Sequence, residues 1–349
     1  MKFKNKVTAF LKKKDIEISV KRYLQEALSA MALGLFASLL IGLIIKTLGE
    51  QTVNLFGENP ISLFLVDTGV VAMGLMGAGV GVAVSWALKA PPMVLFAGAI
   101  TGMMGASLGG PAGAFLAAAL GAEFGKMVSK ETKVDIIVTP AVTLIVGMIT
   151  ATVFGPLVDA LMSGLGQIIM TATEMQPFIM GIIVAVIVGL ALTAPISSAA
   201  LCIMLGLGGL AAGAATVGCC SQMVGFAINS YKDNGVGGLM GIGIGTSMLQ
   251  IGNIVKNPWI LIPPTLTGAI LGPVATVIFQ TTNIPIGAGM GTSGFVGQIG
   301  TFTSMGFTLE VLGIVIVLHL LLPGLLSFLG DKALRKMGKI NKGDYTLDV

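Results

Sequence analysis

Charged side chains are scarce in this chain. Asp, Glu, Lys and Arg together make up 10% of its 349 residues, whereas an ordinary soluble domain has about 25%. A water-soluble fold of this length needs a polar surface, and so few charges cannot cover one. Hydrophobic residues account for 54% of the sequence. The composition therefore excludes a soluble globular protein and predicts one that crosses a bilayer many times.

Histidine and cysteine are also rare. The chain has one His and three Cys, at Cys202, Cys219 and Cys220, without CxxC spacing. We expect these thiols to be buried and unpaired, and no spacing is typical of a metal site. The pattern offers neither a Ser-His-Asp arrangement nor a pair of close carboxylates. We therefore expect no cofactor and no catalytic centre, so the chain is not predicted to be an enzyme.

The net charge of +4 does not indicate a nucleic-acid partner, because the basic residues lie at the chain ends and in short loops. Ten apolar stretches are instead close to the roughly 20 residues that a membrane-spanning helix needs. They are 27–45, 60–88, 91–110, 111–128, 134–162, 176–194, 195–229, 235–255, 259–281 and 307–329. Because 111–128 is short and 195–229 is long, eight to eleven spans fit the pattern. We predict an all-α polytopic membrane protein with about ten spans.

The basic residues predict the orientation in the bilayer. Residues 1–25 are rich in Lys, with Phe3, Val7, Phe10 and Leu11 on one helical face, so they suit a basic amphipathic helix on the membrane surface or a plain solvated tail. Lys and Arg favour the cytoplasmic side. We therefore predict a cytoplasmic segment 1–25, a transmembrane domain 26–330 and a cytoplasmic tail 331–349. The loops 49–59 and 163–175 carry Glu but no Lys or Arg and are predicted to lie outside, whereas Lys126, Lys130 and Lys133 mark a cytoplasmic loop.

One internal repeat spans two distant parts of the chain. Gly77–Pro91 and Gly181–Pro195 are identical at eight of fifteen positions, including the Ala-Leu-x-Ala-Pro ending. Gly155-Pro156 and Gly272-Pro273 form a weaker match. Two related halves are common in membrane transporters. Chance matching among Gly, Ala and Val is the alternative.

A second, sharper repeat has the pattern G-x-G-x-G-T-S. It occurs at Gly241–Ser247 and Gly287–Ser293, and Gln-Ile-Gly follows each copy. Each Gly costs a helix roughly 1 kcal/mol relative to Ala, so the pattern predicts broken, re-entrant segments. Such backbone survives at membrane depth only when it is buried in protein or lines a wet cavity. We expect the two segments to adopt extended backbone, to face each other and to form a solute site. The alternative is Gly used only for close helix packing.

Neutral polar groups beside these motifs are suited to binding a polar solute. The candidate binding residues are Asp67, Thr246, Ser247, Gln250, Asn253, Thr292, Ser293 and Gln298; Gln222 and Asn229 are further neutral candidates. Glu310 and His319 are candidates for coupling, because ionisable groups at bilayer depth are costly. The alternatives are a hydrogen-bonded helix contact for Asp67, a helix N-terminus for Glu310 and a satisfied buried ring for His319.

Several long segments carry a family resemblance. NPISLFLVDTGVVAMGLMGAG, ALKAPP, GIGIGTSMLQIGN, IPPTLTGAILGP and GAGMGTSGFVGQIGT resemble the enzyme IIC-like components of the bacterial phosphotransferase system, including the perfringolysin-regulator type. The resemblance covers about residues 15–335. It implies a permease of a sugar-like solute in the bacterial plasma membrane, acting as a homodimer, with separate IIA and IIB proteins handling phosphate. The substrate-binding Glu motif of glucose-type members has no clear match here, which leaves phosphoryl coupling open. Two other functions stay open: an ion-coupled secondary transporter, and a membrane sensor that regulates gene expression through a partner.

Overall fold

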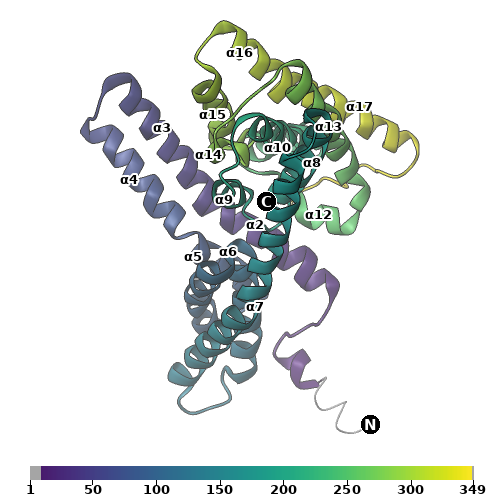
Figure 1. Cartoon of the computed structure of the whole chain (residues 1–349). Helices are drawn as coiled ribbons and strands as arrows, with labels where there is room; N and C mark the ends of the chain where they lie inside the picture. The colour runs from purple at the N-terminus through teal and green to yellow at the C-terminus, as the bar shows by residue number, and fades with distance from the viewer. Residues whose placement is uncertain (1–8, 348–349) are drawn as a thin grey trace. The chain divides into compact units, whose positions relative to one another are not determined.

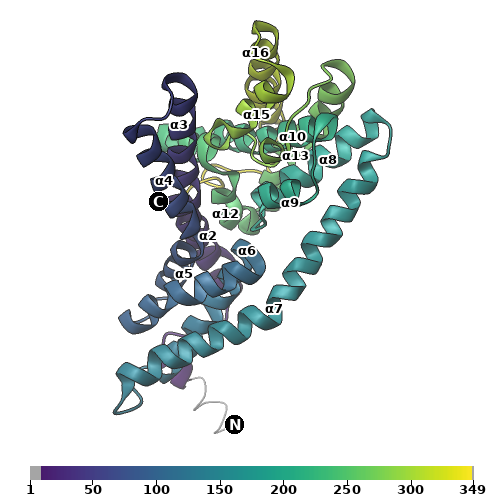
Figure 2. The same ribbon diagram turned by 60° about the vertical axis from the view of Figure 1, so that its left-hand side comes forward.

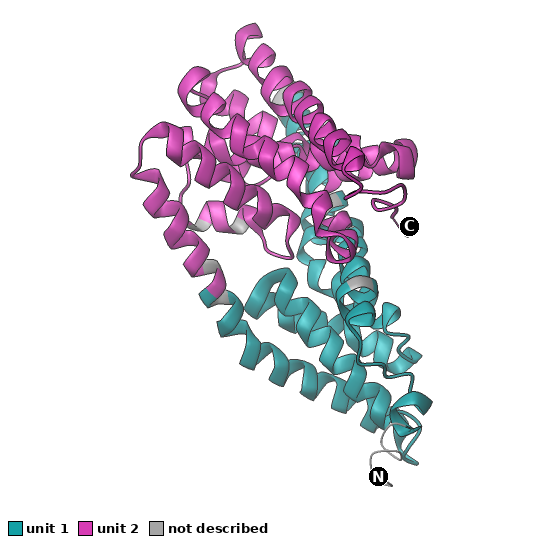
Figure 3. Cartoon of the chain, turned by 90° about the vertical axis from the view of Figure 1, so that its right-hand side faces the viewer, with its two compact units in different colours: residues 1–160 teal, residues 161–349 magenta. Residues whose placement is uncertain are grey.

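The computed structural model describes residues 9–347, and within them the chain is built from helices without a strand (Figure 1). The predicted all-α polytopic class is therefore confirmed. The chain divides into two compact units, residues 1–160 and 161–349 (Figure 3). Phe3 and Val7, half of the predicted amphipathic face, lie outside the described residues.

Six of the described helices are long and apolar enough to span a membrane, and a seventh span arises if the bent pair α4–α5 counts as one. This is fewer than the ten apolar stretches of the sequence. Parts of two predicted outer loops are helical instead, because α3 (Ile41–Phe56) runs through most of 49–59 and α7 (Asp135–Thr173) through most of 163–175. Figure 2 shows α7 as one long helix. The exact number of crossings stays a prediction.

Unit 1 begins with a helical run that continues into α3 and contains η1 (Lys21–Ala27), α2 (Leu28–Leu35) and η2 (Phe36–Leu40). The side chain of Asn59 caps α4 (Pro60–Gly74) by accepting from the backbone N–H of Ser62 at 3.0 Å. After a 49° bend, α5 (Met76–Ala87) packs against α6 (Pro92–Val128).

The helix α6 is a hairpin of two arms. Gly109 and Gly110 leave helical geometry, and Gly110 has a φ of +57°, which only Gly adopts without strain. A Cβ on Gly105 would lie 2.2 Å from the carbonyl oxygen of Gly113, although residues eight apart in a straight helix are separated by about 12 Å. The arms therefore lie side by side, and Pro111 opens the second arm. The break matches the predicted boundary between the stretches 91–110 and 111–128; that each arm crosses the membrane stays a prediction.

Buried charges join the N-terminal segment to the rest of unit 1. Lys126 Nζ donates to the carbonyl oxygens of Asp15 (2.9 Å) and Leu88 (2.8 Å) and lies 2.9 Å from Glu123 Oε2. Arg22 Nη2 also donates to Leu88 O, at 3.0 Å, and Tyr23 donates its hydroxyl proton to Glu123 Oε1. Lys126 and Arg22 are both almost fully buried. Lys126 is thus an internal cation of this unit and not a solvated loop residue.

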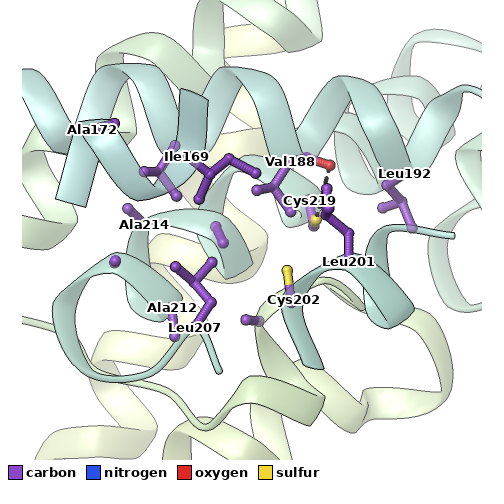
Figure 4. Close-up of a cluster of buried hydrophobic side chains, with 14 of the residues drawn as sticks. Ile169, Ala172, Val188, Leu192, Leu201, Cys202, Leu207, Ala212, Ala214 and Cys219 are labelled. Atoms are coloured by element: carbon purple, nitrogen blue, oxygen red, sulfur yellow. Dashed lines mark hydrogen bonds between the residues drawn. The ribbon is translucent and has the colours of Figure 1, made fainter. Parts of the chain in front are cut away.

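Unit 2 is built around α10 (Gly209–Asn229), which packs against α8 (Pro177–Thr193), α13 (Ile262–Pro273) and α17 (Leu322–Lys336). Figure 4 shows the apolar core in which α10 takes part, with Ile169, Leu201 and Cys219 among its members. All three Cys residues are buried and free. The other elements of this unit are α9 (Ser198–Met204), α11 (Tyr231–Met240), η3 (Gly241–Gly245), η4 (Ser247–Gln250), α12 (Ile251–Lys256), η5 (Pro258–Leu261), η6 (Val274–Ile278), α14 (Pro285–Ala288), η7 (Ser293–Phe295), α15 (Val296–Met305), α16 (Leu309–Val315) and η8 (Ile316–Leu321).

The internal repeat places one copy in each unit, on α5 and on α8. In unit 1, a Cβ on Gly81 would lie 2.0 Å from the carbonyl oxygen of Gly98. In unit 2, Ala185 occupies the position matched to Gly81, and its carbonyl oxygen would lie 2.0 Å from a Cβ on Gly218. Gly81 and Ala185 occupy the same position of the repeat, and each brings its helix into backbone-to-backbone contact with a neighbouring helix, α6 in unit 1 and α10 in unit 2. This shared contact favours a duplication over a chance match.

Candidate functional site

The two G-x-G-x-G-T-S segments lie against each other in unit 2. Thr292 of the second segment donates its hydroxyl proton to the carbonyl oxygen of Gly243 in the first, at 2.5 Å. The prediction that the segments face each other is confirmed. The predicted extended backbone is wrong for both segments. Gly241–Gly245 forms a single π-helical turn. In the second segment, Gly287 and Ala288 end the helix α14, and a run of turns leads from Gly289 into η7. The first segment is helical because its turn continues directly from the end of α11.

The first segment breaks at Thr246. This residue is extended, with φ −158° and ψ 143°, and its hydroxyl oxygen accepts from the backbone N–H of Met248 at 3.1 Å. The chain then restarts as η4 and α12. Thr246, Ser247 and Gln250 are buried, so the irregular backbone is shielded by protein as membrane depth requires.

The side chain of Asn283, four residues before the second segment, joins α10 to α15. Asn283 Nδ2 lies 2.7 Å from Thr216 Oγ1, 2.9 Å from the carbonyl oxygen of Gly297 and 3.1 Å from Thr301 Oγ1. Gly291 has a φ of +54°, and a Cβ there would lie 2.8 Å from the backbone of Cys219 on α10. Gly291 therefore serves the backbone turn and close packing at once, so the packing alternative holds for part of this motif.

A chain of neutral hydrogen bonds leads from the first segment into the helices. The hydroxyls of Ser247 and Thr193 are 2.8 Å apart. Thr193 donates to Gln222 Oε1 at 3.3 Å, and Gln222 Nε2 donates to Thr265 Oγ1 at 2.9 Å. Ser247, Thr193 and Gln222 are buried. The four side chains come from η4, α8, α10 and α13, and we call them the hydroxyl–amide chain. The sequence analysis did not name Thr193 or Thr265 as site residues. The signal available for Thr193 was its position directly before the Ala-Pro end of the repeat.

Gln298 lies in a second polar cluster. Its Nε2 is 3.2 Å from His319 Nδ1 and 3.5 Å from Cys220 Sγ, and its Oε1 is buried without a hydrogen-bond partner. A buried unsatisfied acceptor costs about 1–3 kcal/mol. Turning the amide over would exchange the two atoms and place the N–H₂ group where Oε1 now lies without a partner. One end of the Gln298 amide is therefore unpaired in either orientation. This end can accept or donate one hydrogen bond to a solute.

Two further candidates, Gln250 and Asn253, bind another part of unit 2. Gln250 Nε2 donates to the carbonyl oxygen of Tyr345 at 2.9 Å, and Asn253 Nδ2 donates to Gln250 Oε1 at 2.8 Å and to the carbonyl oxygen of Thr346 at 2.9 Å. These two amides hold the C-terminal segment. Ser293 is buried at the start of η7.

The two acidic candidates, Asp67 and Glu310, are both exposed. Asp67 is an exposed residue of α4 in unit 1. Glu310 is exposed in the first turn of α16, whose N-cap is Thr308. A carboxylate in the first turn stabilises a helix N-terminus. Within residues 9–347, no three His, Cys, Asp or Glu side chains come together as a metal site would need.

Comparison with known proteins identifies the family. The model of the family described as "Phosphotransferase system, EIIC" matches residues 25–347. No curated protein and no solved structure matches the chain. Proteins of this family are the membrane sugar-transport subunits of phosphotransferase systems. The chain therefore belongs to the phosphotransferase system EIIC family.

Proposed function

We propose that the chain is a permease for a small, uncharged, sugar-like solute, bound by the hydroxyl–amide chain and Gln298. The observation that carries this proposal is the placement of neutral hydroxyl and amide groups, buried, beside two broken segments of unit 2. Sugar hydroxyls both donate and accept, and so do these groups. The groups named here include no Lys or Arg. An anionic solute would need such a cation to offset its loss of hydration, so a neutral solute fits better.

In this proposal the phosphate chemistry lies with separate IIA and IIB proteins. The protein works as a homodimer in the bacterial plasma membrane. Family membership supports the separate partners, because EIIC components are the transport subunits of such systems; the homodimer and the bacterial plasma membrane follow from the resemblance alone.

Replacing the amides tests the solute site. Gln298→Ala and Gln222→Ala are each expected to weaken solute binding by about threefold to tenfold, since each removes one neutral hydrogen bond. Binding is measured by thermal shift of the purified protein against a panel of neutral sugars, because a ligand of the folded state raises the melting temperature. Gln167→Ala is the matched control, since Gln167 is exposed on α7. If both variants fold and bind sugar as the parent does, the two Gly-rich segments are packing elements and the site lies elsewhere.

The proposed orientation has a separate test. Both termini are expected to be cytoplasmic, because basic residues gather at each end of the chain. Alkaline phosphatase fused after Val349 should then be inactive, whereas the enzyme inserted at Gly57, between α3 and α4, should be active. Activity of the C-terminal fusion would reverse the orientation.

A further inference from the structure

The chain turns back after α17 toward α12 (Figure 1). We call residues 338–347 the strap. The sequence predicts them as part of a cytoplasmic tail, residues 331–349, and in the structure Ile340 and Tyr345 are buried. The strap is packed on unit 2 as an integral part of it.

Tyr345 anchors the strap. Its hydroxyl donates to Asp331 Oδ1 at 2.7 Å, and its ring meets Phe226 edge-on at a centroid distance of 6.3 Å. The guanidinium of Arg335 lies 5.5 Å from the ring centroid and donates to Asp331 Oδ2. Burial, followed by the Asp331 carboxylate, raises the pKa of the Tyr345 hydroxyl well above its usual value. The phenol therefore stays protonated and can donate throughout the physiological range.

Side chains that precede and follow the first Gly-rich motif in the sequence form hydrogen bonds with the backbone around Tyr345. Gln250 and Asn234 both donate to the carbonyl oxygen of Tyr345, at 2.9 and 2.8 Å. Asn234 Oδ1 also accepts from the backbone N–H of Leu347 at 2.8 Å. Asn234 lies on α11, before the motif, and Gln250 lies just after it. The strap thus joins the two flanks of Gly241–Ser247.

A second set of contacts lies nearer to α17. Asn257 Nδ2 donates to Asp344 Oδ2 at 2.7 Å and to the carbonyl oxygen of Lys339 at 2.9 Å. The ammonium of Lys339 lies 4.7 Å from the ring centroid of Trp259, a cation–π contact. The flank that follows the motif is therefore held over residues 250–259, while Asp233 on the other flank accepts from the backbone N–H of Gly343 at 3.2 Å.

We propose that the strap is a clamp that keeps the break at Thr246 closed, and that its release opens the Gly241–Ser247 segment to water. Backbone broken at Thr246 has no continuous helical ladder to hold it. Besides the bonds from Thr292 to Gly243 and between Ser247 and Thr193, its position depends on the contacts that the strap makes with its two flanks. Gln250 and Asn253 are positioning residues in this arrangement. The role of the clamp in admitting a solute rests on the proposed transport function, but the clamp itself can be tested without any solute.

The test is the rate at which a cysteine placed at the closed segment reacts with a water-soluble maleimide. Ser247→Cys is made in the full chain with Cys202, Cys219 and Cys220 replaced by alanine, and the purified protein is labelled in detergent. Ser247 is fully buried beneath the break, so slow labelling is expected with the strap in place. Tyr345→Ala removes the anchor and should raise the rate at least about tenfold, since losing a buried aromatic ring is among the costliest substitutions. Tyr345→Phe keeps the ring and should raise it less.

Two further variants guard against trivial outcomes. Asp344→Ala leaves the ring pocket intact and should raise the rate severalfold, so the clamp is tested even if Tyr345→Ala fails to fold. Ser85→Cys, a buried serine of α5 in unit 1, should label at the same rate with and without the strap anchor. Equal labelling of Ser247→Cys in the parent, Tyr345→Ala and Asp344→Ala proteins overturns the proposal. Faster labelling of these variants, together with a parent protein that binds no sugar, would support the proposed clamp and contradict only the transport function.

Discussion

Lys126→Met is expected to destabilise unit 1 by about 3–5 kcal/mol, the usual cost of removing one partner from a buried ion pair. The substitution leaves the Glu123 carboxylate buried next to the phenol of Tyr23, without its cation. It also takes a donor from the carbonyl oxygens of Asp15 and Leu88, which fasten the N-terminal segment to the end of α5. The folded unit therefore loses both charge compensation and a link between distant parts of the chain.

Thermal unfolding of the purified protein in detergent measures the effect. Lys133→Met is the matched control, because Lys133 is an exposed cation of the following loop; its melting temperature should stay close to that of the parent. Adding Glu123→Gln to Lys126→Met should restore part of the loss, since the double variant buries no unpaired charge and Gln can still accept from Tyr23. A single variant as stable as the control would show that the buried pair contributes nothing.

Gly218→Ala should be one of the most damaging additions of a single methyl group in unit 2. The added Cβ would lie 2.0 Å from the carbonyl oxygen of Ala185 and 2.6 Å from its carbonyl carbon and Cα. These are backbone atoms, so α8 and α10 would have to move apart. Overpacking of a tight core costs about 1–3 kcal/mol and sometimes more. The expected result is a much lower yield of monodisperse protein and a lower melting temperature.

Gly313→Ala is the matched control for this substitution. Gly313 lies within α16, and a Cβ there would meet no atom within 4 Å. Since Ala favours a helix over Gly by up to about 1 kcal/mol, the control should be neutral or slightly stabilising. The prediction fails if the two alanine variants have the same melting temperature and yield.

The helical class, the hairpin of α6 and the broken motifs could be predicted because each follows from local sequence. Low charge and long apolar stretches require membrane helices, Gly109-Gly110-Pro111 ends one helix and begins another, and Gly-rich runs do not continue a helix. The contact between the two Gly-rich segments was also predictable, because the same unusual pattern occurs twice.

The remaining features depend on tertiary contacts that no local pattern carries. The three Lys residues 126, 130 and 133 look alike as loop markers, yet only Lys126 is buried, because the Glu123 carboxylate and the carbonyl oxygens of Asp15 and Leu88 surround its ammonium group. Tyr345 lies in a polar tail, and its pocket is formed by Asp331, Arg335 and Phe226. Gln250 has the side chain of a sugar-binding residue, but the C-terminal backbone occupies its amide.

The glycine contacts of unit 2 limit how that unit can change shape. At Gly218 and Gly272, α10 and α13 each approach α8 backbone to backbone, leaving no side chains whose rotamers could change to let the helices slide. Close-packed surfaces of this kind move as one body, and hinges form where regular structure is interrupted. The interruptions at Thr246 and between Gly289 and Phe295 lie outside these three helices. The packing therefore leaves the broken segments free to move against α8, α10 and α13, which form a single block.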